Sequence, residues 1–374
     1  MTDILKLNPI SDMVSDILCS GCYNVTASST APEAVLVRSF NMCNGYELPA
    51  SVRVVARAGA GYNNIPYKAY AEKGVVVMNT PGANANAVKE LVIASMFLAS
   101  RNLKRAMNWV DSLKGTEGVA AAVEKNKSAF VGPELMGKTL GLIGLGAIGR
   151  AVAAAATALG MRVIGFDPYL APQMLSALPS SAQCVGCMDE LFSTCDYISL
   201  HAPLTPDTKY CVCEGAIAKM KKGVILINCA RGELVDNAAL IAAVKEGKIA
   251  AYVTDFPTEE LLGIDNVIAI PHLGASTPEA EDNCAVMAAA QIKDYLENGN
   301  IVNSVYLPNL KKARTKARRM VALGTVDVSK IFPVVDCDVA SASANGYYYS
   351  ICDFSGEPGK VCSLPEGVMF VREV

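Results

Sequence analysis

Histidine is scarce in this chain of 374 residues, which contains only His201 and His272. A histidine that acts as general acid or base near neutral pH must therefore be one of these two. His272 is the better candidate because it follows the strand-like segment NVIAIP and precedes LGAST, and ligands bind at the carboxyl ends of strands in open α/β sheets. His201 also ends a strand-like segment, YISLHA, so it stays an alternative.

The chain also lacks an excess of charge of either sign and any long apolar run. Its net charge is -3 at pH 7 and its pI is about 5.6, so it does not carry the charge pattern that binds nucleic acid or an anionic membrane. No apolar stretch reaches membrane-spanning length, and the first residues do not resemble a signal peptide. We therefore expect a cytoplasmic protein with a small-molecule partner.

The cysteines do not form a recognisable framework. Thirteen of them are scattered at irregular spacing, which is typical of reduced thiols. Cys184 and Cys187 form a CxxC pair and Cys211 and Cys213 a CxC pair, but no other pair follows either of them at the spacing of a zinc site. We expect neither structural disulfides nor a bound metal.

The length and the apolar content predict two folded domains. A chain of 374 residues exceeds the size of one hydrophobic core, and 52% of its residues are hydrophobic. Short β-branched segments alternate with helical ones between residues 34 and 107, and a second such series begins at KTLGLIGLG. This alternation is typical of α/β domains with doubly wound parallel sheets.

The final quarter of the chain has a different character. Residues 278–297 read as one long helix, opened by Thr277 and Pro278 and closed by Asn298 and Gly299. Six of the nine residues from 311 to 319 are basic, which is consistent with a linker. Short β-like segments follow, so residues 309–374 are expected to form a small C-terminal tail.

Three glycines identify a dinucleotide site. Gly144, Gly146 and Gly149 form GxGxxG directly after the strand-like segment TLGLIG and at the start of a helix over 148–159. The first glycine permits a tight turn, the second admits a pyrophosphate, and the third lets helix and strand pack closely. Turn glycines of an ordinary βα unit are the alternative interpretation.

An acidic residue indicates which dinucleotide is bound. Asp167 ends the next strand-like segment, RVIGFD, eighteen positions after Gly149, where a carboxylate can accept hydrogen bonds from the adenosine ribose. A carboxylate repels a 2′-phosphate, so NAD is favoured over NADP. Because Pro168 follows, Asp167 could instead serve only as a turn residue.

Arg231 and Glu259 follow two further strand-like segments. Arg231 comes after the apolar run VILINCA, which tolerates a charge only with a partner, and its planar fork suits the carboxylate of an anionic substrate. A structural acid is the alternative partner. Glu259 lies in TDFPTEELL, and a carboxylate bonded to an imidazole would orient the ring and raise its pKa. Alone, Glu259 is an ordinary loop acid.

Four motifs, in this order and spacing, resemble those of the D-2-hydroxyacid dehydrogenases. They are GLGAIG with Asp167, NCARGELVD, DFPTEELL and PHLGAST. RAGAGYNNI and VMNTPGAN upstream also resemble their substrate domain, so the similarity covers about residues 34–308. The resemblance implies a flavodoxin-like substrate-binding domain over 1–98 and 279–308, a Rossmann NAD-binding domain over 99–278, and the tail over 309–374. It also implies a homodimer or homotetramer, to which residues 108–128 would contribute a crossing arm.

The resemblance assigns roles residue by residue. Arg231, Glu259 and His272 match the catalytic arginine, glutamate and histidine, while Arg57 and Gly59 match the substrate-binding segment. Lys127 is a weaker candidate for a second positive charge at the substrate. The residues that would line NAD are Thr80, Gly144, Gly146, Ala147, Ile148, Gly149, Asp167, Cys229, Ala230, Arg231, Asp255, His272, Leu273, Gly274 and Ala275.

The implied reaction is NAD-dependent oxidation of 3-phospho-D-glycerate to 3-phosphohydroxypyruvate, the first step of L-serine biosynthesis. A glyoxylate or hydroxypyruvate reductase is the alternative within the fold, and an NAD-sensing protein similar to transcriptional corepressors is the alternative from another class. The family commonly reads DVFxxEP, so a residue is missing here and Glu260 competes with Glu259 for the catalytic role. The tail lies where many relatives carry an ACT domain, but it resembles at most a truncated one.

Overall fold

Contacts within the chain divide it into two compact units. The computed structural model describes residues 1–334, 336–358 and 363–374. We call Ala85–Thr277 the central unit, and Met1–Asn84 together with Pro278–Val374 the discontinuous unit. The expected boundary between residues 98 and 99 lies inside helix α3, Ala85–Ser100. The apolar side chains of α3 pack into the core of the central unit, and the division by contacts therefore falls before this helix.

The central unit is built on a seven-stranded parallel sheet with the order β12-β11-β10-β9-β6-β7-β8. The chain therefore changes direction across the sheet between β6 and β9, which is where ligands bind in open α/β sheets. The strands are β6 (Thr139–Ile143), β7 (Arg162–Phe166), β8 (Gln183–Cys184), β9 (Tyr197–Leu200), β10 (Val224–Asn228), β11 (Ile249–Thr254) and β12 (Val267–Ala269).

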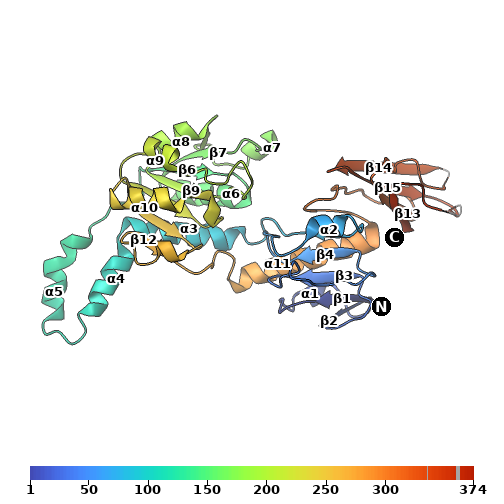
Figure 1. Ribbon diagram of the computed structural model, residues 1–374, viewed down its shortest axis with the longest axis horizontal. Helices are drawn as coiled ribbons and strands as arrows, with labels where there is room; N and C mark the ends of the chain where they lie inside the picture. Colours follow the sequence, from blue (N-terminus) through green and yellow to red (C-terminus); the bar gives the residue numbers. More distant parts are fainter. Residues whose placement is uncertain (335, 359–362) are drawn as a thin grey trace. The chain divides into compact units, whose positions relative to one another are not determined.

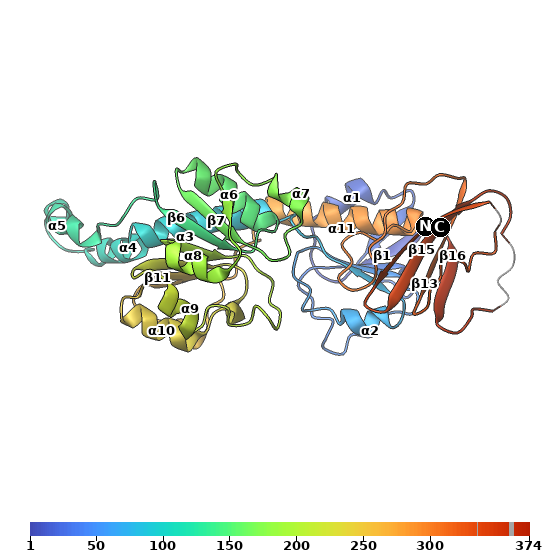
Figure 2. The ribbon, with the colours of Figure 1, turned by 90° about the horizontal axis from the view of Figure 1, so that it is seen from above.

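Helices cover both faces of this sheet (Figures 1 and 2). Helices α3 and α6 share one apolar core with the sheet, and α8, α9 and α10 share another. Strands buried on both faces are expected to be largely apolar, and β6 and β10 are buried along their whole length with one polar residue each, Thr139 and Asn228. The remaining bounds are α6 (Ala147–Ala158), α7 (Pro172–Leu175), α8 (Met188–Thr194), α9 (Glu214–Lys219), η2 (Gly232–Leu234), α10 (Asn237–Lys245) and η3 (Glu259–Leu261).

Two helices extend from the central unit as an arm (Figure 1). The arm contains α4 (Leu103–Ser112), α5 (Val119–Asn126) and η1 (Lys127–Phe130), and none of these elements has a buried residue. Helix α4 nevertheless exposes Leu103, Met107 and Val110, which lie three or four residues apart and so share one face. The arm therefore carries an apolar stripe that its own unit does not cover.

The discontinuous unit contains a five-stranded parallel sheet with the order β2-β1-β3-β4-β5, the order of flavodoxin-like folds. With the central sheet, it confirms the predicted α/β class with two doubly wound parallel sheets. Its strands are β1 (Thr2–Lys6), β2 (Tyr23–Thr26), β3 (Ala34–Val37), β4 (Val54–Arg57) and β5 (Val76–Met78), and its helices are α1 (Val14–Ile17), α2 (Tyr67–Ala71) and α11 (Pro278–Asn298).

Helix α11 matches the long helix expected over 278–297. Its small residues Ala285, Ala288 and Ala289 join the core around β3 and β4, together with Ile292 and Tyr295. Within the described ranges, no helix combines the length and the apolar character needed to cross a membrane.

The tail forms a four-stranded antiparallel sheet with the order β14-β15-β13-β16. In the described part of the tail we find strands and no helix, so neither helix of a βαββαβ unit is present there. Val321 and Tyr349 on one face belong to the core of the discontinuous unit, and the Tyr349 hydroxyl donates to the Gly299 carbonyl at 2.6 Å. The strands are β13 (Arg318–Gly324), β14 (Cys337–Ala344), β15 (Tyr347–Phe354) and β16 (Val368–Glu373).

The basic run over 311–319 is not a solvated linker, which corrects the sequence interpretation. Arg319 is completely buried and donates to both carboxylate oxygens of Asp353, at 2.5 and 2.9 Å. Lys312 donates to the same carboxylate at 2.6 Å and to Asp338 at 2.7 Å. These ion pairs bind the start of the tail to strands β14 and β15.

Candidate dinucleotide and catalytic site

The glycine-rich loop has the geometry of an anion cradle. Gly144 has a φ of +96°, and a Cβ on it would lie 2.7 Å from the His201 carbonyl carbon. A Cβ on Gly149 would lie 2.1 Å from the Gly144 oxygen, so helix α6 can approach the loop only with glycine there. At Gly146 a Cβ would meet nothing within 4 Å. This glycine therefore faces open space.

Helix α6 begins at this loop without a side-chain cap. Gly146 occupies the N-cap position, and no side chain accepts from the first backbone N–H groups. These N–H groups and the positive end of the helix dipole favour an anion. The open cradle and the uncapped helix fit the pyrophosphate of a dinucleotide.

Asp167 is held beside the same loop. Its Oδ2 accepts from the Leu145 backbone N–H at 2.9 Å, and its Oδ1 accepts from the Tyr169 N–H at 3.0 Å. Each carboxylate oxygen can accept further hydrogen bonds, so this anchoring still leaves acceptors for ribose hydroxyls. The turn role considered for Asp167 and the ribose role are thus compatible.

Three side chains meet at the carboxyl ends of β10, β11 and β12. Arg231 follows β10, Phe256 follows β11 and His272 follows β12, and these strands are neighbours in the sheet. The Arg231 guanidinium carbon lies 5.9 Å from the centre of the Phe256 ring, and the His272 ring centre lies 4.5 Å from it. Both residues therefore lie against the Phe256 ring.

Asn228 shapes the turn that carries Arg231, and the sequence interpretation missed it. Its Oδ1 accepts from the Ala230 N–H at 3.1 Å, and its Nδ2 donates to the Arg231 carbonyl at 2.8 Å and to the Tyr252 hydroxyl at 3.3 Å. The residue is completely buried. A polar residue at the end of an otherwise apolar strand was the available signal, since a buried amide requires partners.

Asp255 lies beneath this cluster as a buried carboxylate. Burial raises its pKa, while the nearby charge of His272 and the backbone N–H of Gly274 oppose that shift. Oδ2 accepts from Gly274 N–H at 3.3 Å, whereas Oδ1 has no hydrogen-bond partner within the described structure. The free oxygen can accept a hydrogen bond from a ligand.

The two competing glutamates differ in their partners. Both are exposed on η3. Glu260 Oε1 accepts from Asn237 Nδ2 at 2.7 Å, whereas the Glu259 side chain makes no hydrogen bond to any described residue. Glu259 is thus the one free to act elsewhere, although nothing in the described part of the chain bonds it to His272.

His201 occupies a different kind of position from His272. Its backbone lies against Gly144, and its buried Nε2 has no hydrogen-bond partner among the described residues. Burial lowers the pKa of His201 to about 4, which keeps the ring neutral at pH 7. His272, in contrast, is exposed.

The other expected dinucleotide residues lie on the same loops, with one exception. Thr80 belongs to the discontinuous unit, where it is buried and its N–H donates to the Gly59 carbonyl at 3.2 Å. The rest follow strand ends of the central unit or open α6: Ala147, Ile148, Cys229, Ala230, Leu273, Gly274 and Ala275.

Arg57 is the last residue of β4 in the discontinuous unit. Its Nε donates to Asn64 Oδ1 at 3.3 Å, and a Cβ on Gly59 would lie 2.1 Å from its Nη1. Gly59, with a φ of +154°, therefore makes room for the guanidinium. Lys127 is an exposed residue of the arm in the central unit, paired with Glu124 at 2.5 Å.

Arg38 is a second cation near Arg57 that the sequence interpretation missed. It follows β3, in which Val37 lies opposite Arg57 of β4. Asn64 links the two, because its Nδ2 donates to the Arg38 carbonyl at 3.3 Å while its Oδ1 accepts from Arg57. Arg38 also pairs with Glu281 at 2.6 Å. An arginine directly after a buried strand was the signal.

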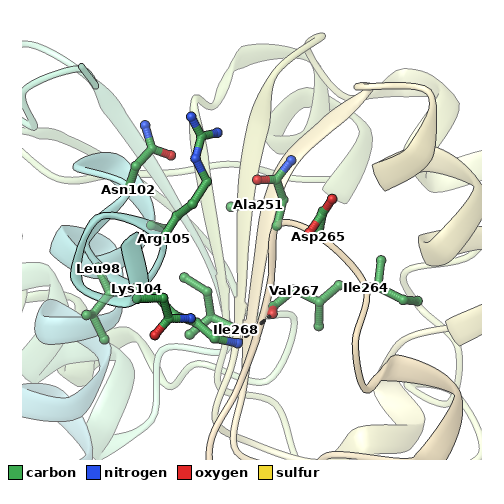
Figure 3. A pocket seen from close by; sticks show the side chains of 12 residues that line it. Leu98, Asn102, Lys104, Arg105, Ala251, Ile264, Asp265, Val267 and Ile268 are labelled. Atoms are coloured by element: carbon green, nitrogen blue, oxygen red, sulfur yellow. Dashed lines mark hydrogen bonds between the residues drawn. The ribbon is translucent and has the colours of Figure 1, made fainter. Parts of the chain in front are cut away.

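A separate hollow of about 260 Å³ lies at the other end of the strands of the central sheet from His272 (Figure 3). Leu98 and Asn102 line one side of it and Ile264 and Val267 the other, and the Lys104 ammonium donates to the Val267 carbonyl at 3.3 Å. Because Val267 begins β12, this hollow is at the amino end of the strand and away from His272. In the described residues, no cluster of three or more His, Cys, Asp and Glu side chains could hold a metal.

Comparison with known proteins gives a consistent result. Residues 93–274 match the NAD binding domain of the D-isomer specific 2-hydroxyacid dehydrogenases. The D-3-phosphoglycerate dehydrogenase of Methanocaldococcus jannaschii is 41% identical over 274 residues, which are 72% of this chain and 50% of that protein. The hydroxypyruvate reductase of Thermotoga maritima is 42% identical over 257 residues, which are 66% of this chain and 78% of that protein.

A solved structure matches as well. The NAD⁺-bound 3-phosphoglycerate dehydrogenase of Entamoeba histolytica superposes with a TM-score of 0.63 and 28% identity, over 81% of this chain and 98% of that one. The chain spans about half the length of the phosphoglycerate dehydrogenases that it matches in sequence.

Proposed function

Because this chain belongs to the D-isomer specific 2-hydroxyacid dehydrogenase family, we propose that it oxidises 3-phospho-D-glycerate to 3-phosphohydroxypyruvate with NAD, the first step of L-serine biosynthesis. The observation that carries the proposal is the joining of Arg231 and His272 through Phe256 at the edge of a dinucleotide-binding sheet. The naming of several relatives as D-3-phosphoglycerate dehydrogenases supports the substrate.

The chain's own residues would hold the cofactor in a defined order. The N–H groups at Gly146, Ala147 and Ile148 would bind the pyrophosphate, and the Asp167 carboxylate would accept hydrogen bonds from the adenosine ribose. Asp255, whose Oδ1 has no hydrogen-bond partner among the described residues, would lie near the nicotinamide. When bound, NAD supplies the acceptor for the hydride that leaves the substrate carbon.

The proposed chemistry then divides among three side chains. Arg231 binds the substrate carboxylate through its planar fork and polarises the neighbouring oxygen. His272 takes the hydroxyl proton as the hydride departs. Glu259, whose carboxylate has no other hydrogen bond among the described residues, orients the imidazole and stabilises its protonated form.

Two arginines are proposed to bind the substrate phosphate. Arg57 and Arg38 stand at the ends of adjacent strands and share Asn64. Guanidinium groups bind phosphate bidentately, so a pair of them suits a dianion. A phosphorylated hydroxy acid is therefore favoured over an unphosphorylated one.

Reduction of hydroxypyruvate or glyoxylate is the second candidate. The observation in its favour is coverage, because the matched region is 78% of the Thermotoga maritima reductase. The reductase reaction would use the same Arg231 and His272, and its unphosphorylated substrate would not need Arg57 and Arg38.

We further propose that the protein is a cytoplasmic homodimer or homotetramer. The exposed stripe of Leu103, Met107 and Val110 on the arm would be covered by a second copy, since monomers rarely leave such a contiguous apolar face in water. The described cysteines are all free, in keeping with a reducing compartment. Sedimentation of wild type against Met107→Glu would test the assembly.

The deciding experiment is an initial-rate assay of NADH production from purified protein and NAD. It compares 3-phosphoglycerate with glycerate, lactate and 2-hydroxyglutarate. A strong preference for 3-phosphoglycerate supports the proposal. Preference for an unphosphorylated acid keeps the family reaction but overturns the substrate, and tight NADH binding without turnover of any acid favours an NAD-sensing protein.

A further inference from the structure

Cys184 and Cys187 form an exposed pair of thiols that the dehydrogenase reaction does not use. Only Val185 and Gly186 separate them. Both thiols are free, and both are accessible to small oxidants from solvent. Their place in the fold, rather than their spacing alone, makes them of interest.

The pair lies at the edge of the central sheet, close to Asp167, the carboxylate proposed to bind the adenosine ribose. Cys184 ends strand β8, where it lies opposite Gly165 of β7, and the Val185 N–H donates to the Gly165 carbonyl at 2.9 Å. Asp167 is two residues beyond Gly165, just past the end of β7. Burial, and then the negative charge of Asp167, raise the pKa of the Cys184 thiol, as expected of close neighbours.

The segment between the two thiols has room to fold. A Cβ on Gly186 would meet no atom within 4 Å, so the space beside this residue is open. Cys187 occupies the N-cap position of α8 in an extended conformation, with φ −148° and ψ 154°. A disulfide needs Cα atoms within about 7 Å, which two intervening residues can provide once the bend closes.

We propose that Cys184 and Cys187 are a redox-modification site, at which a peroxide forms a disulfide that weakens dinucleotide binding. The Cys187 thiol attacks the peroxide oxygen, which gives a sulfenic acid and one water. The Cys184 thiol then attacks that sulfur, forming the S–S bond and releasing a second water. In total, two thiols lose two protons and two electrons, and hydrogen peroxide is reduced to two waters.

The expected effect follows from the hydrogen bonds of the edge strands. Closing the bend moves Val185, whose N–H bonds Gly165, and so moves the end of β7 that carries Asp167. The Asp167 carboxylate then leaves the Leu145 N–H and the position from which it meets the ribose. Loss of one hydrogen bond to a charged group weakens binding by about tenfold or more.

The test measures NADH affinity by fluorescence titration of the full-length protein before peroxide, after peroxide, and after dithiothreitol. Peptide mass spectrometry follows the loss of two hydrogens from the 184–187 peptide. Cys184→Ser and Cys187→Ser are the test variants. The matched control is the double variant Cys19→Ser with Cys22→Ser, which removes the exposed CxxC pair of the discontinuous unit.

We expect peroxide to weaken NADH binding about tenfold in wild type and in the Cys19/Cys22 control, with recovery in dithiothreitol. Either single variant at the proposed pair should keep its NADH affinity after peroxide. The inference is overturned if the disulfide forms without any change in affinity, if no disulfide forms, or if the variants lose affinity as wild type does.

The inference rests on the dinucleotide site of the proposed function but not on its substrate. Failure to oxidise 3-phosphoglycerate would leave the binding measurement intact, because that measurement needs no turnover. If the reduced protein does not bind NADH, the cofactor site and this inference fail together.

Discussion

Replacing Asp353 with asparagine should destabilise the discontinuous unit strongly. The buried Arg319 guanidinium donates to both oxygens of this carboxylate, at 2.5 and 2.9 Å, and Lys312 donates at 2.6 Å. Asparagine keeps the shape but removes the charge, so Arg319 would remain buried without its counter-ion. Breaking a buried ion pair on one side costs about 3–5 kcal/mol.

Thermal unfolding followed by circular dichroism measures this loss. A unit of about 150–250 residues loses roughly 2–4 °C in Tm for each kcal/mol, so we expect a decrease of about 6–20 °C in the transition of the discontinuous unit. Asp338→Asn is the matched control, because Asp338 pairs with the same Lys312 but its side chain is 46% exposed. That change should cost less than about 1 kcal/mol.

The stability that the Asp353 carboxylate contributes should also depend on pH. Burial alone would raise the pKa of Asp353, but hydrogen bonds from Arg319, Lys312 and Thr315 outweigh it and lower the pKa below its usual range. Its contribution to stability is therefore present above about pH 4, the pKa of an unfolded Asp, and is lost as pH falls toward the folded pKa.

Equal Tm losses in the Asp353→Asn and Asp338→Asn variants, or an Asp353→Asn loss under about 1 kcal/mol, would refute the reasoning about the buried ion pair.

Three further predictions concern the site. Asp167→Ala should relax the preference for NAD over NADP in NADH and NADPH titrations, and an unchanged preference would remove its ribose role. His272→Asn should lower kcat about 100-fold or more while NADH affinity is kept. Full activity in this variant would assign the general acid-base role to His201 instead. Gly149→Ala should abolish NADH binding, because the new Cβ would meet the Gly144 oxygen at 2.1 Å, whereas Gly186→Ala, with open space around its Cβ, should not. Wild-type binding in Gly149→Ala would show that the loop tolerates displacement.

The βα alternation and the glycine pattern could be predicted because both are local. Most strands of the central sheet are short, mainly apolar runs, and Gly144, Gly146 and Gly149 follow one of them at fixed offsets. The expected strands and the long helix over 278–297 therefore correspond to observed elements. The domain boundary expected after residue 98 was harder to place from the sequence, because α3 is continuously helical across it and only its packing assigns the helix to one unit.

Pairings between distant residues could not be predicted from the sequence. Arg319 and Asp353 are opposite each other only because β13 and β15 align in that register, so six basic residues in nine suggested a linker. Arg38 became a candidate only when β3 was found beside β4. Glu259 and Glu260 are adjacent in sequence, and what distinguishes their surroundings is the hydrogen bonds that Asn237 and Thr258 donate to Glu260.

The division of the discontinuous unit between the two ends of the chain has a consequence for synthesis. Strands β1 to β5 are synthesised before the central unit, yet the core that covers them includes Ala285, Ala288 and Tyr295 of α11 and Val321 of β13. The central unit, made of continuous sequence, can fold while those strands still wait for their partners. The nascent chain must therefore keep an apolar parallel sheet from premature association until α11 and β13 have been made.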